Sequence, residues 1–186
     1  VSFGIELFLG KYSKIKFVNI QHLSPKDFHI DLRRAELEEN ASLEWNDACV
    51  GAGFVHSNCF VSLLGRRAES KLNSVFFGSE KQQFNLYWGM LHSAPETVSN
   101  MLTKGALDDF AKAVYRGEIH ILRSAPGSNG YQKEDSLLLS KDAESDAVPK
   151  LEIDNNDVKC SHGATVSQVD KEKLFYMQSR GLSIGE

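Results

Sequence analysis

A cysteine and a histidine two residues apart are the side chains of this sequence best suited to bind a metal. Cys160 and His162 lie in the run LEIDNNDVKCSHGAT, residues 151–165, which we expect to form a strand. Because strand side chains alternate between two faces, Val158 and Ala164 would share the face of this pair. The Cα atoms of Cys160 and His162 would lie about 6.5–7 Å apart by the rise of a strand. A thiolate and an imidazole at that separation can meet on one metal ion or one atom of a metal cluster.

Two ligands do not complete a metal site, and the same pattern also has a structural explanation. A closed structural zinc site takes four nitrogen or sulfur ligands, and no second ligand pair at comparable spacing occurs in the sequence. Any further ligands beside Cys160 and His162 would therefore come from another surface. Alternatively, the pair points into the core, since free cysteine is among the residues most often buried. The sequence alone leaves both interpretations open.

Two other motifs resemble a metal site and a nucleotide-binding loop, but their spacing or their residues do not fit such a site. His56 and Cys59 are three residues apart, so they would lie on opposite faces of a strand and could not share a ligand without a bend. The segment Gly51–Gly53 lacks the third glycine and the following helix of a dinucleotide-binding loop. No G-x-x-x-x-G-K-[ST] motif occurs in the sequence. We therefore expect this chain to bind no nucleotide.

A β-helical carbohydrate-binding or carbohydrate-active protein is the alternative function. Carbohydrate-active enzymes use paired carboxylates, and Glu152 and Asp154 would share one face of a strand. We expect that face to be the solvated outer side. Tyr87 and Trp88 could form a sugar platform, but aromatic side chains contribute large buried areas wherever they pack, so they are as easily core residues.

Composition limits the class of protein. With 186 residues, of which 41% are hydrophobic, the chain can bury a substantial core and has the length of one domain. A net charge of −4 offers no basic field for nucleic acid, and no apolar run reaches the length of a membrane span. The first ten residues lack a secretory signal, and three cysteines suit reduced thiols better than a disulfide scaffold. We therefore expect a cytoplasmic protein that binds neither nucleic acid nor membrane.

Short runs rich in β-branched and apolar residues dominate the chain, and turn signals separate them. Few of these runs exceed ten residues, which predicts an all-β fold. We expect a turn at Asn46-Asp47 and a projecting loop over Ala125–Asp135, which is rich in turn-forming residues. The expected strand runs are Ile15–Ile20, Phe28–Leu37, Ser42–Trp45, Ala48–Val50, Phe54–Leu64, Leu72–Phe77, Phe84–Met90, Ala113–Ile121, Leu137–Leu139 and Leu151–Ile153.

The spacing of local patterns indicates a repeat architecture. Similar segments lead to Gly51, Gly78 and Gly117 at intervals of about 25–40 residues, a range typical of solenoids. The repeat is loose, and by itself it supports a jelly roll and a β-helix almost equally. Asn129-Gly130 is the one Asn-Gly pair in the sequence that would favour an antiparallel hairpin.

One helix is expected near the C-terminal end. Residues 170–181 have Asp170 as a potential cap, an apolar stripe around Leu174, and Gly181 where a helix-terminating glycine belongs. We expect this helix to close the end of the repeat array. The missing initiator methionine and the abrupt finish at Ile184–Glu186 indicate a piece of a longer protein.

Several segments resemble one protein family, in the same order along the chain. The run at residues 151–165, followed by LFYMQSRG at Leu174–Gly181, is similar to the carboxy-terminal signature of the SufB/SufD family, the scaffold proteins of iron–sulfur cluster assembly. KGALDDFAKAVYRGEIHI at Lys104–Ile121 and DSLLLS at Asp135–Ser140 resemble the same family. The resemblance covers roughly residues 70–185.

The fold that this resemblance implies is a right-handed parallel β-helix. It favours the solenoid over the jelly roll that the spacing left open. We accordingly expect a β-helix core domain over residues 1–170 and the start of a C-terminal helical segment over residues 171–186.

The resemblance also implies a function. In SufD-like members the histidine of the CSHGAT motif is implicated in cluster assembly at the contact with SufB, and here it is His162, with Cys160 as the second candidate ligand. SufB-like members carry a cysteine just before the D-S-L-L run, where this sequence has Glu134, which favours a SufD-like role. The implied protein is a non-enzymatic scaffold that holds a transient iron–sulfur cluster. A SufB-like partner or a second copy of the chain would share the cluster, and a SufC-like ATPase would dock on C-terminal helices beyond the β-helix.

Overall fold

Twelve strands and one helix make up the part of the chain that the structure describes, residues 1–183 of a computed structural model. The odd-numbered strands form sheet A, in the order β1-β3-β5-β7-β9-β11, and the even-numbered strands form sheet B, in the order β2-β4-β6-β8-β10-β12. The elements are β1 (Ser2–Leu9), β2 (Lys14–Gln21), β3 (Phe28–Leu37), β4 (Ser42–Cys49), β5 (Phe54–Leu63), β6 (Glu69–Gly78), β7 (Gln83–His92), β8 (Val98–Leu107), β9 (Lys112–Ile121), β10 (Asn129–Leu138), β11 (Glu144–Ile153), β12 (Lys159–Gln168) and α1 (Lys171–Ser179).

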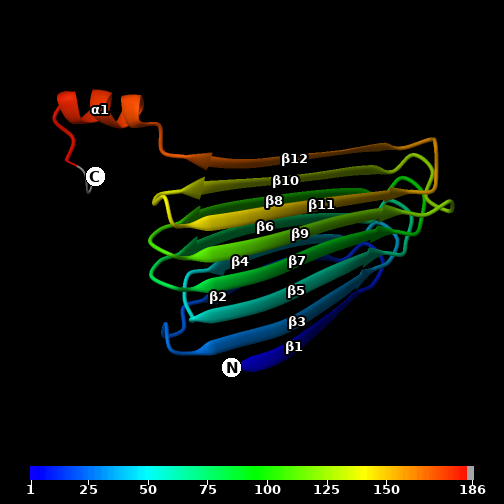
Figure 1. Ribbon diagram of the computed structural model, residues 1–186. Coiled ribbons are helices and arrows are strands. Elements are labelled where there is room, and N and C mark those ends of the chain that lie inside the picture. The colour runs from blue at the N-terminus through cyan, green and yellow to red at the C-terminus, as the bar shows by residue number, and fades with distance from the viewer. Residues whose placement is uncertain (184–186) are drawn as a thin grey trace.

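The two sheets face each other, and successive coils of the chain stack into a parallel β-solenoid (Figure 1). Each strand pairs in parallel with the strand one coil later, as Phe28 of β3 does with Phe54 of β5 and Lys112 of β9 with Glu144 of β11. Those two pairs give the shortest and longest coils, so the repeat length falls in the expected range. The expected all-β solenoid with a short C-terminal helix is therefore confirmed. Its right-handed winding stays a prediction.

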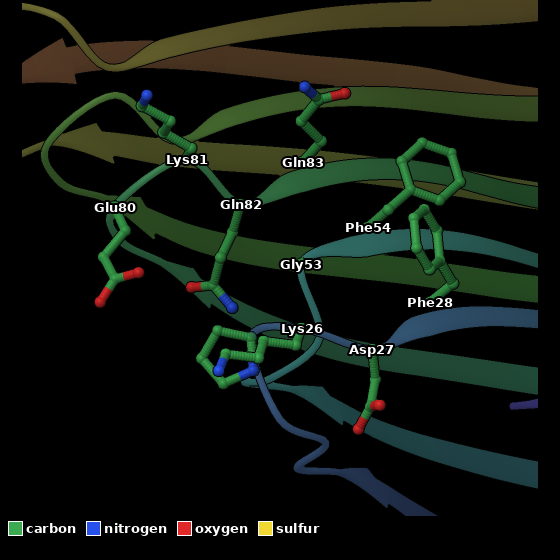
Figure 2. A pocket seen from close by; sticks show the side chains of 10 residues that line it. Lys26, Asp27, Phe28, Gly53, Phe54, Glu80, Lys81, Gln82 and Gln83 are labelled. Atoms are coloured by element: carbon green, nitrogen blue, oxygen red, sulfur yellow. The ribbon is translucent and has the colours of Figure 1, made fainter.

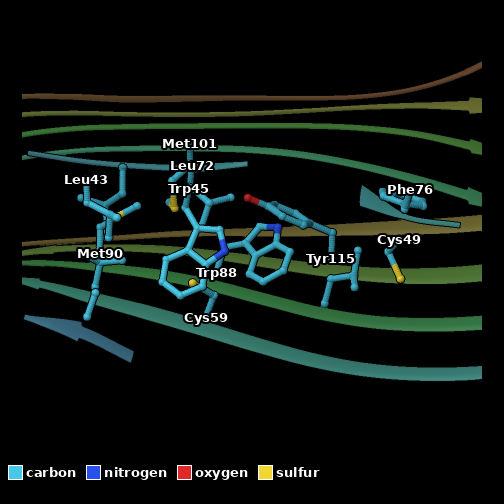
Figure 3. Close-up of a cluster of buried hydrophobic side chains, with 14 of the residues drawn as sticks. Leu43, Trp45, Cys49, Cys59, Leu72, Phe76, Trp88, Met90, Met101 and Tyr115 are labelled. Atoms are coloured by element: carbon cyan, nitrogen blue, oxygen red, sulfur yellow. The ribbon is translucent and has the colours of Figure 1, made fainter. Parts of the chain in front are cut away.

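Alternation along each strand separates a buried side from a side that faces solvent. In β5, Val55 and Cys59 are buried at 0% exposure, while His56 and Asn58 are half-buried on the outer side. Because the register is parallel, inward residues of successive coils stack directly above one another. Trp45 and Trp88 meet from opposite sheets at the centre of the core, beside Met101 (Figure 3). Burial of each large apolar side chain contributes about 1.5–3 kcal/mol.

Residues with a left-handed backbone in the turns link neighbouring coils. Asn40 and Glu96 have φ angles of 55° and 60°. The N–H of Asn40 donates to the carbonyl of Arg66 and the N–H of Glu96 to that of Pro126, each at 2.9 Å and each one coil further along. A non-glycine residue in this conformation costs about 1–2 kcal/mol, and the hydrogen bond to the next coil offsets part of that cost. The same arrangement recurs at Tyr12, Arg67 and Gly127.

The Gly51–Gly53 segment lets two turns pack backbone to backbone. A Cβ at Gly51 would lie 2.4 Å from the backbone N and O of Leu23, and a Cβ at Gly53 would lie 2.3 Å from the carbonyl oxygen of Pro25. These glycines therefore serve the stacking of coils, which agrees with their rejection as a dinucleotide-binding loop.

One expected turn is wrong. Asn46 and Asp47 lie in the middle of β4, which runs without a break from Ser42 to Cys49. Asp47 points inward and is bound by Arg33 from the facing sheet. A polar residue at an inward position suggests a turn in the sequence, because its partner lies on the facing sheet and is not visible in the local pattern.

The expected loop over Ala125–Asp135 is also wrong in its second half. β10 begins at Asn129, and Asn129-Gly130 pairs in parallel with β8 and β12 instead of forming a hairpin. Two strands, β1 and β8, lie where no strand was expected. In β8 the inward residues Ser99 and Thr103 are polar, which removes the apolar alternation that would have indicated a strand.

The helix has the expected ends but not the expected place. The N–H of Glu172 donates to Oδ1 of Asp170 at 2.9 Å, and Gly181 has a φ angle of 97°, so cap and terminating glycine are confirmed. However, α1 leads away from β12 (Figure 1), and Phe175 and Tyr176 are 73% and 62% exposed, so the helix does not close the solenoid. No helix among residues 1–183 is long and apolar enough to cross a bilayer. Ile184–Glu186, where the abrupt finish was noted, lies outside the described residues.

A charged network lies inside the N-terminal coils. Arg33, at 0% exposure, donates from Nε to Asp31 and from Nη1 to Asp47, each at 2.7 Å. Its guanidinium group also lies over the rings of Trp45 and Trp88, 5.5 and 5.0 Å from their centroids. Sheets A and B are thus joined through one cation. Such a buried group constrains how the two sheets fit together, because each charge needs its partner in place.

This network predicts a large difference between two adjacent arginines. Arg33→Ala leaves Asp31 and Asp47 buried without their cation, so we expect the free energy of unfolding to fall by about 3–5 kcal/mol. Arg34 points to solvent, and Arg34→Ala should change it by less than about 0.5 kcal/mol. Urea denaturation followed by tryptophan fluorescence measures both. Equal stability of the two variants would contradict the structural importance of the network.

Candidate metal-ligand site at the open end of the solenoid

β11 and β12 are the last strands of sheets A and B, and together they form one end of the solenoid, called here the open end (Figure 1). The register pairs Cys160 with Gly130 and His162 with Gln132, and both residues of β10 are buried. Because paired residues of parallel strands point the same way, Cys160 and His162 both project on the inner side of sheet B. The expected common face of this pair is confirmed.

The two candidate ligands differ in exposure. Cys160 is half-buried and packs against the core, whereas His162 is exposed on the last strand. Burial raises the pKa of the Cys160 thiol, which disfavours the thiolate unless a metal ion binds the sulfur and the proton is released to a base or to water. The interpretation of the pair as core residues therefore fits Cys160 in part and does not fit His162.

A glycine makes room for the thiol. A Cβ at Gly130 would lie 3.3 Å from Sγ of Cys160 and 3.0 Å from a methyl carbon of Ile119. Any larger residue at position 130 would push the thiol outward. The local sequence thus sets the depth at which Cys160 sits.

Cys160 and His162 do not form a complete site by themselves. No group of three or more His, Cys, Asp or Glu side chains among residues 1–183 is arranged to hold a metal ion. A closed site of four ligands would need donors from a second surface that covers the open end.

The second histidine–cysteine pair is separated by the sheet, as expected. Cys59 is buried at 0% exposure on the inner side of β5, and His56 lies half-buried on the outer side. Burial raises the pKa of the Cys59 thiol to about 12. Cys59 is therefore an unreactive core thiol.

The residues considered for carbohydrate chemistry are separated or otherwise engaged. Trp88 is buried at 0% exposure, whereas Tyr87 points outward and donates to Glu118 at 2.8 Å, so the two rings form no common platform. Glu152 and Asp154 lie on the outer side as expected. Their oxygens lie 4.0 and 3.2 Å from Nε2 of His120.

A surface depression of about 360 Å³ lies at turns of the first coils (Figure 2). The rings of Phe28 and Phe54 lie beside each other there, with centroids 6.1 Å apart. Lys26 and Lys81 are among the residues that line it, and no histidine or cysteine does. The depression therefore combines two aromatic rings with charged side chains and contains neither an imidazole nor a thiol ligand.

Glu134 is the residue near the open end whose position the sequence did not predict. It falls in the segment expected to be a loop, but it lies on β10 with 1% exposure, paired in register with Ala164 of β12. Burial raises the pKa of its carboxyl group. The inward residues Gly130, Gln132 and Ser136 show the signal that was available, a period-two row of small and polar residues.

Known proteins similar to this chain share a single description. Residues 2–186 match the family described as SUF system FeS cluster assembly, SufBD core domain. An iron–sulfur cluster assembly SufBD family protein of Mycobacterium tuberculosis is 32% identical over 182 residues, which is 98% of this chain and 22% of that protein. One from Staphylococcus epidermidis is 32% identical over 181 residues, 96% of this chain and 38% of that protein. The chain thus spans well under half the length of these relatives.

The different surroundings of two histidines predict different costs of removal. His162 is exposed, so we expect His162→Ala to change the free energy of unfolding by less than about 0.5 kcal/mol. His92 is buried and bonded at 2.8 Å to both Thr97 and Ser99, and burial lowers its pKa to about 4. His92→Ala should cost about 2–4 kcal/mol through the cavity and the unpaired hydroxyls.

Thermal and urea denaturation of the two variants measure this difference. A His162→Ala protein as unstable as His92→Ala would show that His162 packs as a core residue.

Proposed function

Since this chain belongs to the SufBD family of iron–sulfur cluster assembly proteins, we propose that it is a SufD-like scaffold that contributes His162 and Cys160 to a nascent cluster at the open end. The cluster is cargo, held transiently and shared with a second protein. That protein is a SufB-like partner or another copy of this chain.

The single observation that supports the proposal most is that Cys160 and His162 lie on β12, whose outer edge has no neighbouring strand within residues 1–183. Within residues 1–183, β11 and β12 each have a neighbouring strand on one side only. Their free backbone N–H and C=O groups favour pairing with strands of another chain, and the terminal coils of solenoids need a cap. A partner that pairs with this edge would bring its own ligands to Cys160 and His162.

The ligand chemistry suits a cluster in transit. Thiolate and imidazole both bind iron, and a mixed ligand set changes the lability and potential of a cluster.

Glu134 supports the SufD-like assignment. It occupies the position before the D-S-L-L run at which SufB-like members carry a cysteine. A carboxyl group is not a thiol nucleophile, so it cannot accept persulfide sulfur. In this proposal sulfur therefore reaches the shared site through the partner.

The remaining roles are divided among other chains. The sequence has no P-loop, so we propose that this chain is not an enzyme and that a SufC-like ATPase hydrolyses the nucleotide. Residues 1–170 would be the β-helix core, and the ATPase would bind helices that continue from α1. A cytoplasmic location stays a prediction.

The proposal predicts the effect of His162→Ala in the full-length protein purified with its SufB-like and SufC-like partners. We expect cluster formation to fall about tenfold or more while the complex still assembles. Cys160→Ala should have a similar or milder effect, and His56→Ala, on the outer side of sheet A, should have none. Visible absorption together with iron and sulfide content measures the cluster.

Full cluster formation by a stable His162→Ala complex would remove this residue from the site. Cluster formation that needs no partner would contradict the shared site.

A further inference from the structure

An apolar groove crosses the outer face of sheet B, away from the open end. Its volume is about 310 Å³, and β2, β4, β6 and β8 all contribute to it. Val18, Ile20 and Val75 in its lining are 59%, 70% and 49% exposed, and Ala48 and Leu102 are half-buried between them. These aliphatic side chains point away from the core of the solenoid. A contiguous apolar surface of this kind marks a site at which another molecule excludes water.

The groove runs across the strands, along the direction in which the coils stack. Its lining comes from the same register position in each coil, since Ile20 pairs with Ala48 and Ala48 with Val75. Neighbouring strands lie about 4.8 Å apart, so four strands give the groove a length of about 14 Å. An α-helix advances about 5.4 Å per turn. A helix laid along the groove would therefore offer about one apolar side chain to each coil.

Two amide side chains hold the floor of the groove in place. Asn73 donates from Nδ2 to Oδ1 of Asn46 at 3.0 Å, and Asn46 donates in turn to Oε1 of Glu44 at 3.1 Å. Both asparagines line the groove. Because their hydrogen bonds are formed in the free protein, a ligand does not have to order this surface when it binds.

The surroundings of the groove are basic, although the chain as a whole has a net charge of −4. The outward positions of its four strands carry four lysines and two glutamates, and three of these lysines lie in or beside the groove. The six residues are Lys14, Lys16, Lys71, Lys104, Glu44 and Glu69. The charge on this face therefore favours an anionic ligand.

Lys104 is the lysine best placed to bind an acid on the ligand. It lines the groove and has no ion-pair partner within residues 1–183. Asp135 lies beside it in the register but is paired with Lys133 at 2.9 Å. Glu44, on the other side of the groove, is paired with Lys16 at 2.9 Å.

We propose that this groove docks an acidic amphipathic helix of another protein. Apolar side chains at helical spacing fill the groove, and carboxylates on the flanks of the helix face Lys104 and Lys71. The same charges select against α1 of a second copy, because residues 171–180 contain three cations and one acid. The docking surface is separate from the candidate ligands on β12 and needs no cluster.

The first test uses two designed peptides and the full-length protein. One labelled helical peptide has leucine at positions i, i+3, i+4 and i+7 with glutamate on both flanks, and the other has lysine in place of each glutamate. We expect the glutamate peptide to bind about tenfold or more tightly than the lysine peptide, and its affinity to fall as salt is added. Fluorescence anisotropy measures both affinities. No binding of the glutamate peptide, or equal affinities, would overturn the proposal.

A pair of matched valine variants locates the binding surface. Val75→Glu places a carboxylate in the groove, so we expect it to lower the affinity for the glutamate peptide about tenfold or more. Val148→Glu is the control, because Val148 is 51% exposed on the outer face of sheet A, against 49% for Val75. It should leave the affinity unchanged. Equal losses in the two variants, or no loss in Val75→Glu, would show that the peptide binds elsewhere.

Reversal of one charge separates recognition from folding. We expect Lys104→Glu to weaken binding of the glutamate peptide and to strengthen binding of the lysine peptide, which a loss of folded protein cannot do. The same direction of change for both peptides would overturn the role of Lys104.

Two other occupants of the groove have their own signatures. Sedimentation equilibrium that shows a dimer of the full-length protein, abolished by Val75→Glu, would assign the groove to a second copy. Binding to vesicles of phosphatidylcholine and phosphatidylserine that Val75→Glu abolishes, without binding of the glutamate peptide, would assign it to a membrane surface. Either result would overturn the proposal.

Discussion

Backbone hydrogen bonds between successive coils are the interaction on which the rest of this structure depends. Every inner strand pairs in parallel with one strand before it and one after it, and the turns repeat the same pairing through residues such as Asn40 and Glu96. This arrangement satisfies the backbone only where a further coil follows. Within residues 1–183, β11 and β12 each have one edge without a neighbouring strand, and another chain can pair with these edges. The location of the candidate ligands on β12 follows from the same constraint.

The stacking also explains why the interior can hold polar groups. Because inward positions lie close together inside the solenoid, a buried charge can find partners on its own strand and in the facing sheet, as Arg33 does with Asp31 and Asp47. Trp45 and Trp88 enclose the same cation and keep water out. Among the described residues, buried polar atoms without a hydrogen-bond partner occur along most of the solenoid, from Nδ1 of His29 on β3 to Oε2 of Glu134 on β10.

Much of this could be predicted from the sequence, and the failures have physical causes. Period-two alternation was enough to place Cys160 and His162 on one face and His56 and Cys59 on opposite faces. It could not tell that His162 is exposed, because exposure depends on β12 being the last strand and not on any property of β12 itself. Local patterns failed at β4, β8 and β10, each of which has polar inward residues. Asp47 was interpreted as part of a turn because its cation, Arg33, lies in another strand.

The same limit hid β8 and the start of β10. Gly105 of β8 looks like a strand breaker, but a Cβ there would lie 2.0 Å from the ring of Phe76, so the glycine makes room for an aromatic side chain one coil away. Glu134 likewise fell in a segment whose turn-forming residues suggested a loop, although it lies in the interior. In a solenoid the neighbours that decide burial are about thirty residues away. Short-range patterns therefore reveal the strands more readily than they reveal what fills the core.

The central claim is that the open end is the surface on which a second chain completes the site. Amide hydrogen exchange of the full-length protein, measured alone and after addition of its SufB-like partner, tests this claim most directly. The account predicts that the amides of β11 and β12 become slower to exchange on assembly, while those of β1 to β8 keep their rates. Protection confined to the N-terminal coils or to α1, with β11 and β12 unchanged, would contradict it.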